Sequence, residues 1–137
     1  MSSRLFFDTA PLIYFFEQSY LYYEVVKKFL FENQEKSQYY TSSITDLECL
    51  TLPYRLGNTE KIEAYKKFLE IFDFKKIDIS SEIAEKAAEL RGKYEFLKNF
   101  DSLQIASCIC FDCDFFVTND KQLLNVEEVK SILVANL

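Results

Sequence analysis

The order of apolar and polar positions along the chain predicts strands that alternate with helices. Residues 5–7 are three consecutive apolar residues that lead into Asp8. A strand covered on both faces has such a run without alternation, so we predict an interior parallel strand that ends on Asp8. The segment 114–118 is also almost continuously apolar and predicts another strand of this kind.

The remaining pattern predicts shorter strands and the helices between them. Strands are predicted at residues 39–42, 74–79 and 132–135, and the alternation in 74–79 favours a place nearer the sheet edge. Helical spacing and capping residues predict helices at residues 10–16, 21–31, 44–55, 59–72 and about 99–111, with a short helical turn at 121–124. Ser43 is expected to cap the helix at 44–55, and Thr59 the helix at 59–72. Another helix is predicted to begin at Ser80 or Ser81 and to run through Leu90. The helix at 99–111 is expected to turn Leu103, Ala106, Ser107 and Cys110 inward.

This succession defines the expected architecture. The chain has no internal repeat and no linker, so residues 1–137 are predicted to form a single domain. We expect a three-layer α/β/α fold whose central, mostly parallel sheet has four to five strands.

Composition excludes several classes of protein. Apolar residues make up 49% of the 137 residues, with only 2 Gly and 2 Pro, which excludes a disordered or low-complexity chain. The net charge of −6 argues against a protein that holds nucleic acid by general attraction to phosphates. No apolar run approaches the length of a membrane span and no leader pattern is present, so we predict a cytoplasmic protein without a membrane partner.

The cysteines are interpreted as reduced, buried thiols. The chain has 4 Cys and no His, which leaves a zinc site without its usual ligands. Cys108, Cys110 and Cys113 lie in or beside a predicted helix, where spacings of two and three cannot bring all of the sulfurs to one face. Without His, the Ser-His-Asp and Cys-His arrangements are excluded, and carboxylates, hydroxyls, Lys and metal ions remain for chemistry.

Acidic residues have similar positions at the ends of predicted strands or the starts of predicted helices. They are Asp8, Glu48, Asp101 and Asp120. Connections that leave the carboxyl ends of parallel strands open at one edge of the sheet, so these side chains can meet in one cleft. Carboxylates that are close together repel one another unless a cation lies between them, and oxygen ligands select Mg²⁺ or Mn²⁺. The sequence predicts a site for one or two such ions that activates water against a phosphodiester.

Each of these acids also has an ordinary structural interpretation. Asp8 could cap the following helix, Asp101 could complement a helix dipole, and Asp120 could belong to a turn. Glu48 could be a solvated helix residue, although Leu47, Leu50 and Leu52 suggest an apolar surrounding in which a bare charge is costly.

Other charged residues are assigned secondary or structural roles. Asp46 should point away from Glu48 around the helix, while Asp112 and Asp114 precede a strand and should lie at the opposite end of the sheet. Lys93 and Lys98 precede Asp101 and are candidates for contacting an RNA phosphate.

Four segments together resemble the PIN-domain ribonucleases, and especially the VapC-type toxins of toxin–antitoxin pairs. They are residues 6–14 (FFDTAPLIY), 41–48 (TSSITDLE), 101–106 (DSLQIA) and 116–120 (FVTND). The resemblance covers almost the whole chain and rests on the order and spacing of the segments.

This resemblance implies a Mg²⁺- or Mn²⁺-dependent endoribonuclease that is silenced by a cognate antitoxin. It implies that Asp8, Glu48, Asp101 and Asp120 are the catalytic and metal-binding acids, supported by the hydroxyl of Thr9 or Thr118, with Asn119 in a secondary role. Members of this family are commonly homodimers, and the antitoxin lies along the early helices. The surplus of aromatic residues at positions 14–23 fits a surface for one of these partners.

Two alternatives remain. A PIN-like domain could serve binding or regulation without catalysis. A phosphotransfer domain that forms an aspartyl phosphate also places an Asp after a strand, but the haloacid-dehalogenase type needs an acid where Ala10 stands. The response-regulator type needs an acid pair where Arg4 stands.

Overall fold

A computed structural model describes residues 2–137, and its centre is a sheet of five parallel strands. The strand order is β3-β2-β1-β4-β5, so the first strand is the middle one, as predicted. The strands are β1 (Ser3–Phe7), β2 (Ser37–Ser42), β3 (Lys75–Ile77), β4 (Phe115–Thr118) and β5 (Ser131–Leu133). The predicted strand at 74–79 is shorter, and it does lie at an edge.

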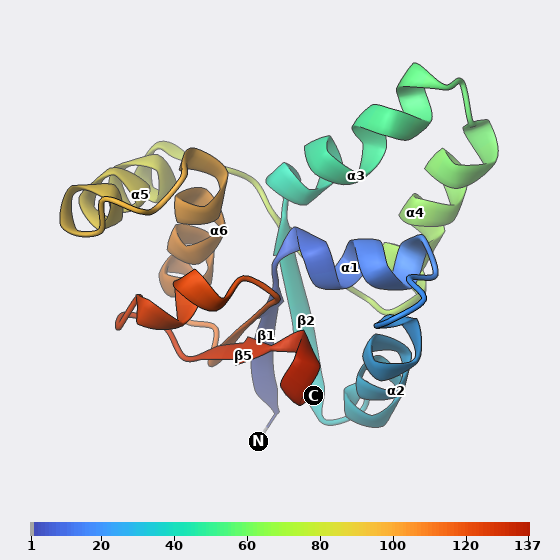
Figure 1. The fold of residues 1–137 in the computed structure, drawn as a ribbon, viewed down its shortest axis with the longest axis horizontal. Coiled ribbons are helices and arrows are strands. Elements are labelled where there is room, and N and C mark those ends of the chain that lie inside the picture. The colour runs from blue at the N-terminus through green and yellow to red at the C-terminus, as the bar shows by residue number, and fades with distance from the viewer. Residues whose placement is uncertain (1) are drawn as a thin grey trace.

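Helices cover both faces of the sheet and give the predicted three layers. Figure 1 shows α5 and α6 on one side, and α1 to α4 on the other. Their bounds are α1 (Thr9–Phe16), α2 (Tyr23–Asn33), α3 (Ser43–Arg55), α4 (Thr59–Ile71), α5 (Ser81–Lys93) and α6 (Asn99–Cys110). Short 3₁₀ helices follow β4 and β5, η1 (Lys121–Asn125) and η2 (Val134–Asn136). The second of these shortens the predicted last strand.

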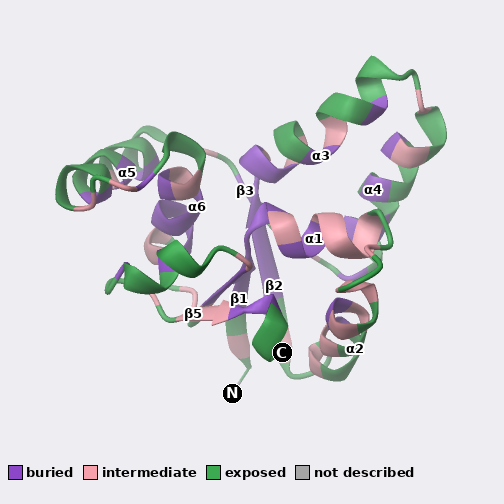
Figure 2. Cartoon of the chain, in the orientation of Figure 1, coloured by how far each residue is buried: buried purple, intermediate pink, exposed green. Residues whose placement is uncertain are grey.

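Each face of the sheet has its own hydrophobic core, and β1 contributes to both. Leu5 and Phe7 pack in the core beneath α1, α2 and α4, whereas Phe6 packs in the core beneath α5 and α6. Phe6 stacks on Phe116 of the neighbouring β4, with ring centroids 5.7 Å apart. The buried colouring of the sheet in Figure 2 agrees with the sequence prediction of a strand covered on both faces.

The structure corrects several local predictions. Ser42 rather than Ser43 caps α3, and Asn58 rather than Thr59 caps α4, because in each case the preceding side chain accepts a backbone N–H of the first turn. The inward face of α6 also differs, since Leu103 and Cys110 are only partly buried while Gln104 is buried. A polar residue at a core position was not expected there.

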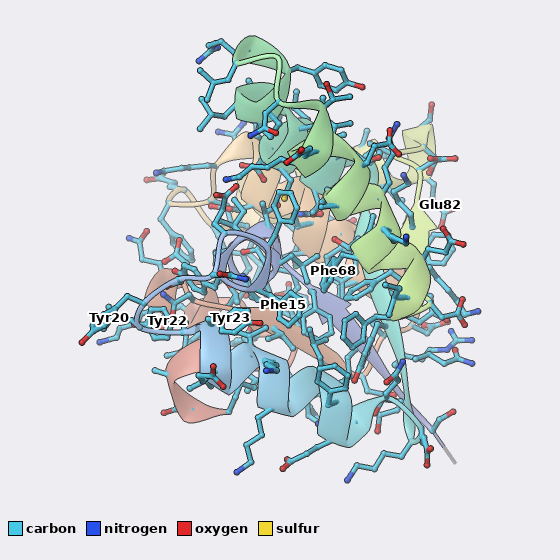
Figure 3. All side chains as sticks on the ribbon, turned by 90° about the vertical axis from the view of Figure 1, so that its right-hand side faces the viewer. Phe15, Tyr20, Tyr22, Tyr23, Phe68 and Glu82 are labelled. Atoms are coloured by element: carbon cyan, nitrogen blue, oxygen red, sulfur yellow. The ribbon has the colours of Figure 1, made fainter. Side chains whose placement is uncertain are left out.

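The aromatic residues of positions 14–23 divide between the core and the surface. Phe15 packs on Tyr23 and Phe68, with ring centroids 5.3 and 4.9 Å apart. Figure 3 shows Tyr20 at the turn between α1 and α2, pointing outward, and it is fully exposed. Most of this predicted surplus is therefore absorbed by packing between helices, and Tyr20 with Leu21 remains on the surface.

The ends of α3 and α4 extend beyond the sheet. Figure 1 shows the two helices forming a projecting hairpin, and its tip is coloured as exposed in Figure 2. Leu52, Tyr54 and Leu56 at this tip are each more than half exposed. Over residues 2–137, the helices are all too short or too polar to cross a bilayer.

Candidate functional site

A cavity of about 660 Å³ opens beside the carboxyl ends of β1 and β4. The predicted acids all line it, and they come from four separate segments: Asp8 after β1, Glu48 in α3, Asp101 in α6 and Asp120 after β4. The cavity therefore gathers the four carboxylates that the positions at the sheet edge predicted.

Asp8 is the most buried of the four acids and is held on both oxygens. Its Oδ1 accepts the backbone N–H of Thr9 at 2.9 Å, which caps α1, and its Oδ2 accepts the hydroxyl of Thr118 at 2.9 Å. Asp8 thus caps α1 and lines the cavity at the same time. Burial raises the pKa of Asp8 to about 7, although both hydrogen bonds lower it. The negative charges of Asp101 and Glu48 raise it further.

Thr9 of α1 holds the side chain of Glu48 of α3 by a hydrogen bond. The hydroxyl of Thr9 donates to Oε1 of Glu48 at 2.7 Å. The two predicted hydroxyls therefore have separate tasks, because Thr118 supports Asp8 and Thr9 supports Glu48. Oε2 of Glu48 is left without a partner by this contact, whereas each oxygen of Asp8 accepts one hydrogen bond and keeps one lone pair.

The surrounding of Glu48 differs from the sequence-based expectation. Glu48 is exposed to the cavity, and Leu47 and Leu52 are 51% and 55% exposed rather than buried around it. Glu48 reaches the site because α3 begins at the sheet edge and its second turn overhangs the cavity, not because an apolar pocket confines it.

Asp101 and Asp120 also line the cavity. Burial raises the pKa of Asp101, and the negative charges of Asp120 and Glu48 raise it further. The positive charge of Lys98 has the opposite effect and lowers the pKa of Asp101. Asp120 also caps η1, since its Oδ1 accepts the backbone N–H of Gln122 at 3.0 Å.

The remaining sequence candidates take different positions. Asn119 lines the cavity and donates to the hydroxyl of Tyr14 at 2.8 Å. Lys98 acts on Asp101, as described. Lys93 is absent from the cavity wall, because its ammonium contacts Glu128 at 3.1 Å and lies 5.2 Å from the ring centre of Tyr94. Its charge is already paired, so the geometry gives no support for a phosphate contact by Lys93.

The acids that were excluded from the site lie elsewhere. Asp46 accepts the hydroxyl of Tyr65 at 2.8 Å and pairs with Lys76 at 2.8 Å. Asp114 accepts the backbone N–H of Arg4 at 2.7 Å, at the amino end of β1 and far along the strand from Asp8. Both contacts agree with the prediction that these residues do not face the cleft.

A buried polar network behind the cavity was not predicted. Gln104 donates to the hydroxyls of Thr9 at 3.2 Å and Thr45 at 3.0 Å, and its Oε1 accepts the hydroxyl of Ser42. Thr45 in turn shares a 2.8 Å hydrogen bond with Thr41. The network ties α6 to α1 and α3, the helices that carry the acids. The only sequence signal was Gln104 itself, a polar residue one helical turn after Asp101.

The donor set fits a hard divalent cation. Its oxygens are carboxylates and hydroxyls, the ligands that Mg²⁺ and Mn²⁺ accept. Burial raises the pKa values of Asp8 and Asp101, neighbouring negative charges raise them further, and a bound cation would offset both effects. Within the described range 2–137, however, no three acidic or cysteine side chains already stand as a complete metal-binding group. A cation that keeps several waters requires only one or two protein carboxylates.

The amino-acid sequence matches a known domain family over most of its length. Residues 5–129 match the PIN domain. The chain is a PIN-domain protein. This membership confirms the family that the four sequence segments resemble.

Solved structures share the fold of this PIN domain at low sequence identity. A chain of a toxin–antitoxin complex from Klebsiella pneumoniae superposes with a TM-score of 0.74 and 22% identity, covering 97% of this chain and 99% of that one. A chain of VapBC2 from Rickettsia felis, bound to a DNA fragment of its promoter, superposes with a TM-score of 0.69 and 20% identity, covering 95% of this chain and 98% of that one. A chain of FitAcB from Neisseria gonorrhoeae superposes with a TM-score of 0.71 and 20% identity, covering 97% of this chain and 99% of that one. No curated protein sequence matches the PIN domain described here.

Proposed function

We propose that this PIN domain is a Mg²⁺- or Mn²⁺-dependent endoribonuclease of the VapC type, which hydrolyses phosphodiester bonds in RNA. The proposal rests above all on the four carboxylates that line one cavity from four separate segments. Unpaired acids gathered in this way raise one another's pKa and weaken the fold, which favours a function that uses them.

Asp8, Glu48, Asp101 and Asp120 would hold the ion. A bound divalent cation supplies activated water and offsets charge on the phosphodiester. Thr118 keeps Asp8 in place, and Thr9 keeps Glu48 in place, so the acids present their free oxygens to the cavity. Burial of Asp8 keeps bulk water away from one side of the site.

Other residues of the wall would position RNA beside the acids. Lys121 lines the cavity, and Lys98 lies near enough to act on Asp101, so both can contact phosphates that flank the scissile one. Tyr14 offers an aromatic ring in the same wall, where a base of single-stranded RNA can stack. Local cations of this kind overcome the net negative charge of the chain.

The proposed biological setting is a toxin held inactive by an antitoxin protein in the cytoplasm, with the toxin as a homodimer. The structural relatives include toxin–antitoxin complexes, which supports this setting. Exposed apolar side chains at Tyr20 and Leu21 suit an antitoxin segment along α1 and α2. Light scattering after gel filtration would test the dimer.

The function is tested by incubating the purified protein with structured and unstructured RNAs in Mg²⁺, Mn²⁺ or EDTA. We expect cleavage with either metal, none with EDTA, and a loss of at least 100-fold in Asp8→Asn and Asp101→Asn, as for groups that act on the transition state. Asp46→Asn is the matched control, because Asp46 lies on α3 outside the cavity.

Three results would count against the proposal. Equal cleavage by wild type and by Asp8→Asn would mean that a contaminant cuts the RNA. Labelling of Asp8 by a phosphate donor would instead favour the phosphotransfer alternative, and metal binding without cleavage of any RNA would favour a regulatory PIN domain.

A further inference from the structure

Three of the four cysteines gather where α6 ends, and two of them are brought together by the turn that follows. Asp112 adopts the left-handed conformation, with φ of 51°. The backbone N–H of Cys113 donates to the carbonyl of Cys108 at 3.0 Å, and that of Asp112 donates to Ile109 at 3.0 Å. These two bonds are the pair that defines a Schellman motif at a helix C-terminus.

A Schellman motif frequently brings the side chains of its first and last residues into contact. Here those residues are Cys108 and Cys113. Because the N···O distance is 3.0 Å, standard bond lengths limit the distance between their Cα atoms to about 6.9 Å. A disulfide requires a separation below about 7 Å, so the pair can be bridged without a large backbone movement.

The two thiols also influence each other, because the neighbouring Cys113 raises the pKa of Cys108 and burial raises it further. The thiol of Cys108 donates to the backbone carbonyl of Phe115, with a sulfur–oxygen distance of 3.9 Å. The other cysteines are separate from this pair. Cys110 borders a surface hollow with Glu82 and Lys86 of α5, and Cys49 lies in the core beneath α1, α2 and α4.

The pair is unequal in access to solvent. Cys108 is 1% exposed, whereas Cys113 is partly exposed after the end of the helix. A small reagent therefore has better access to Cys113 than to the buried Cys108. This arrangement of one accessible and one resolving thiol is typical of cysteines that are oxidised reversibly.

We propose that Cys108 and Cys113 form a redox-active dithiol that low-molecular-weight disulfides oxidise to an intramolecular disulfide. The thiolate of Cys113 attacks one sulfur of the small disulfide, whose S–S bond breaks and releases one thiol. Cys108 then loses its proton and attacks the sulfur of Cys113, which releases the second thiol. Two protein thiols are oxidised and one small disulfide is reduced to two thiols.

The bridge would join the end of α6 to the segment that enters β4. Asp101 lies in the first turn of α6 and Thr118 ends β4, so the linked elements are two that build the acidic cavity. The proposal does not depend on RNA cleavage, because it concerns the thiols of the folded chain alone.

The test uses the folded protein in a buffer of oxidised and reduced glutathione, followed by acid quenching, unfolding, alkylation and mass spectrometry. Wild type should lose two hydrogen atoms in mass and expose two fewer cysteines to alkylation, and dithiothreitol should reverse both changes. Cys110→Ser, the matched control on the same helix, should form the same bridge.

Two further variants separate the steps. Cys108→Ser should stop with glutathione attached to Cys113, because no second thiol resolves the adduct. Cys113→Ser should form no bridge and no adduct at the buried Cys108, and since Cys113 is partly exposed this variant is expected to fold. A bridge in Cys113→Ser, or a wild-type protein that stops at the glutathione adduct or stays fully reduced when the buffer is made strongly oxidising, would overturn the proposal.

Discussion

The buried carboxyl of Asp8 should make the stability of the metal-free protein depend on pH. Its pKa rises from the ordinary value of 3.8 to about 7 in the folded chain, mainly through burial. Well below pH 3.8 the carboxyl is protonated in both states, and its protonated form is compatible with the fold. Between pH 4 and 7 the folded chain retains a proton that the unfolded chain has lost, so the free energy of unfolding falls as pH rises.

The size of the effect follows from the two pKa values. The difference between a pKa of 3.8 in the unfolded chain and about 7 in the folded chain corresponds to roughly 4 kcal/mol, since each pKa unit is worth about 1.4 kcal/mol. About 2 kcal/mol of this should be lost by pH 5, and nearly all by pH 8. Asp8 is only 8% exposed, so solvent screening reduces the effect little.

Asp8→Asn removes the charge and retains the geometry. Asn is as good a helix cap as Asp, and its amide can donate to the hydroxyl of Thr118 that now donates to Asp8. At pH 8 in EDTA the variant should therefore be more stable than wild type by up to about 4 kcal/mol, and the gain should shrink to about 2 kcal/mol at pH 5.

Urea unfolding followed by far-UV circular dichroism at pH 5, 6, 7 and 8 measures this difference, since the chain has no Trp for fluorescence. Adding Mn²⁺ at pH 8 should stabilise wild type and leave Asp8→Asn little changed, because binding to the folded state alone raises stability. A difference between the two proteins that stays constant from pH 5 to 8 would refute the reasoning. Asp46→Asn should show no gain at pH 8, because Asp46 is paired with Lys76.

Three other substitutions test separate features. Gln104→Leu should lower the free energy of unfolding in urea by about 2–4 kcal/mol, because it leaves the hydroxyls of the buried network without a partner. Its control is Ser107→Ala, which should lower that free energy by less than about 1 kcal/mol because the Ser107 hydroxyl bonds to its own helix. Thr118→Val should move the pH-dependent loss of stability to higher pH, since it removes a hydrogen bond that lowers the pKa of Asp8; an unchanged midpoint would contradict this role. Gly57→Ala should lower the thermal midpoint by an amount equivalent to about 1 kcal/mol, because φ is 63° there, and an unchanged midpoint would show that the turn adapts.

The candidate site was predictable where it depends on the ends of elements. Asp8 and Asp120 follow apolar runs, and Asp101 opens a helix, so a parallel sheet brings them to one edge whatever the details of packing. Glu48 was assigned to the same site, but the argument from its leucine neighbours was wrong. The helix α3 projects from the body of the domain and leaves Leu47 and Leu52 exposed, and only Leu50 packs partly against the core.

Features that depend on pairing between distant segments were not predictable. The helical spacing of apolar residues predicted that Leu103 and Cys110 face inward on α6. Gln104 is buried instead, because three hydroxyls from α1, β2 and α3 converge on its amide. The contact of Cys108 with Cys113 requires a left-handed Asp112, and a non-glycine residue gives little local signal for that conformation. Neither feature can be recognised without the tertiary structure.

The place of β1 in the middle of the sheet also determines when the cavity can exist during synthesis. Asp8 is made early, but its partner Thr118 lies 110 residues later, and β4 must pair with β1 before the two can meet. At ordinary rates of translation that interval takes roughly 5 to 20 s. A nascent chain therefore carries its acids apart, and the cleft closes only when nearly all of the domain has left the ribosome.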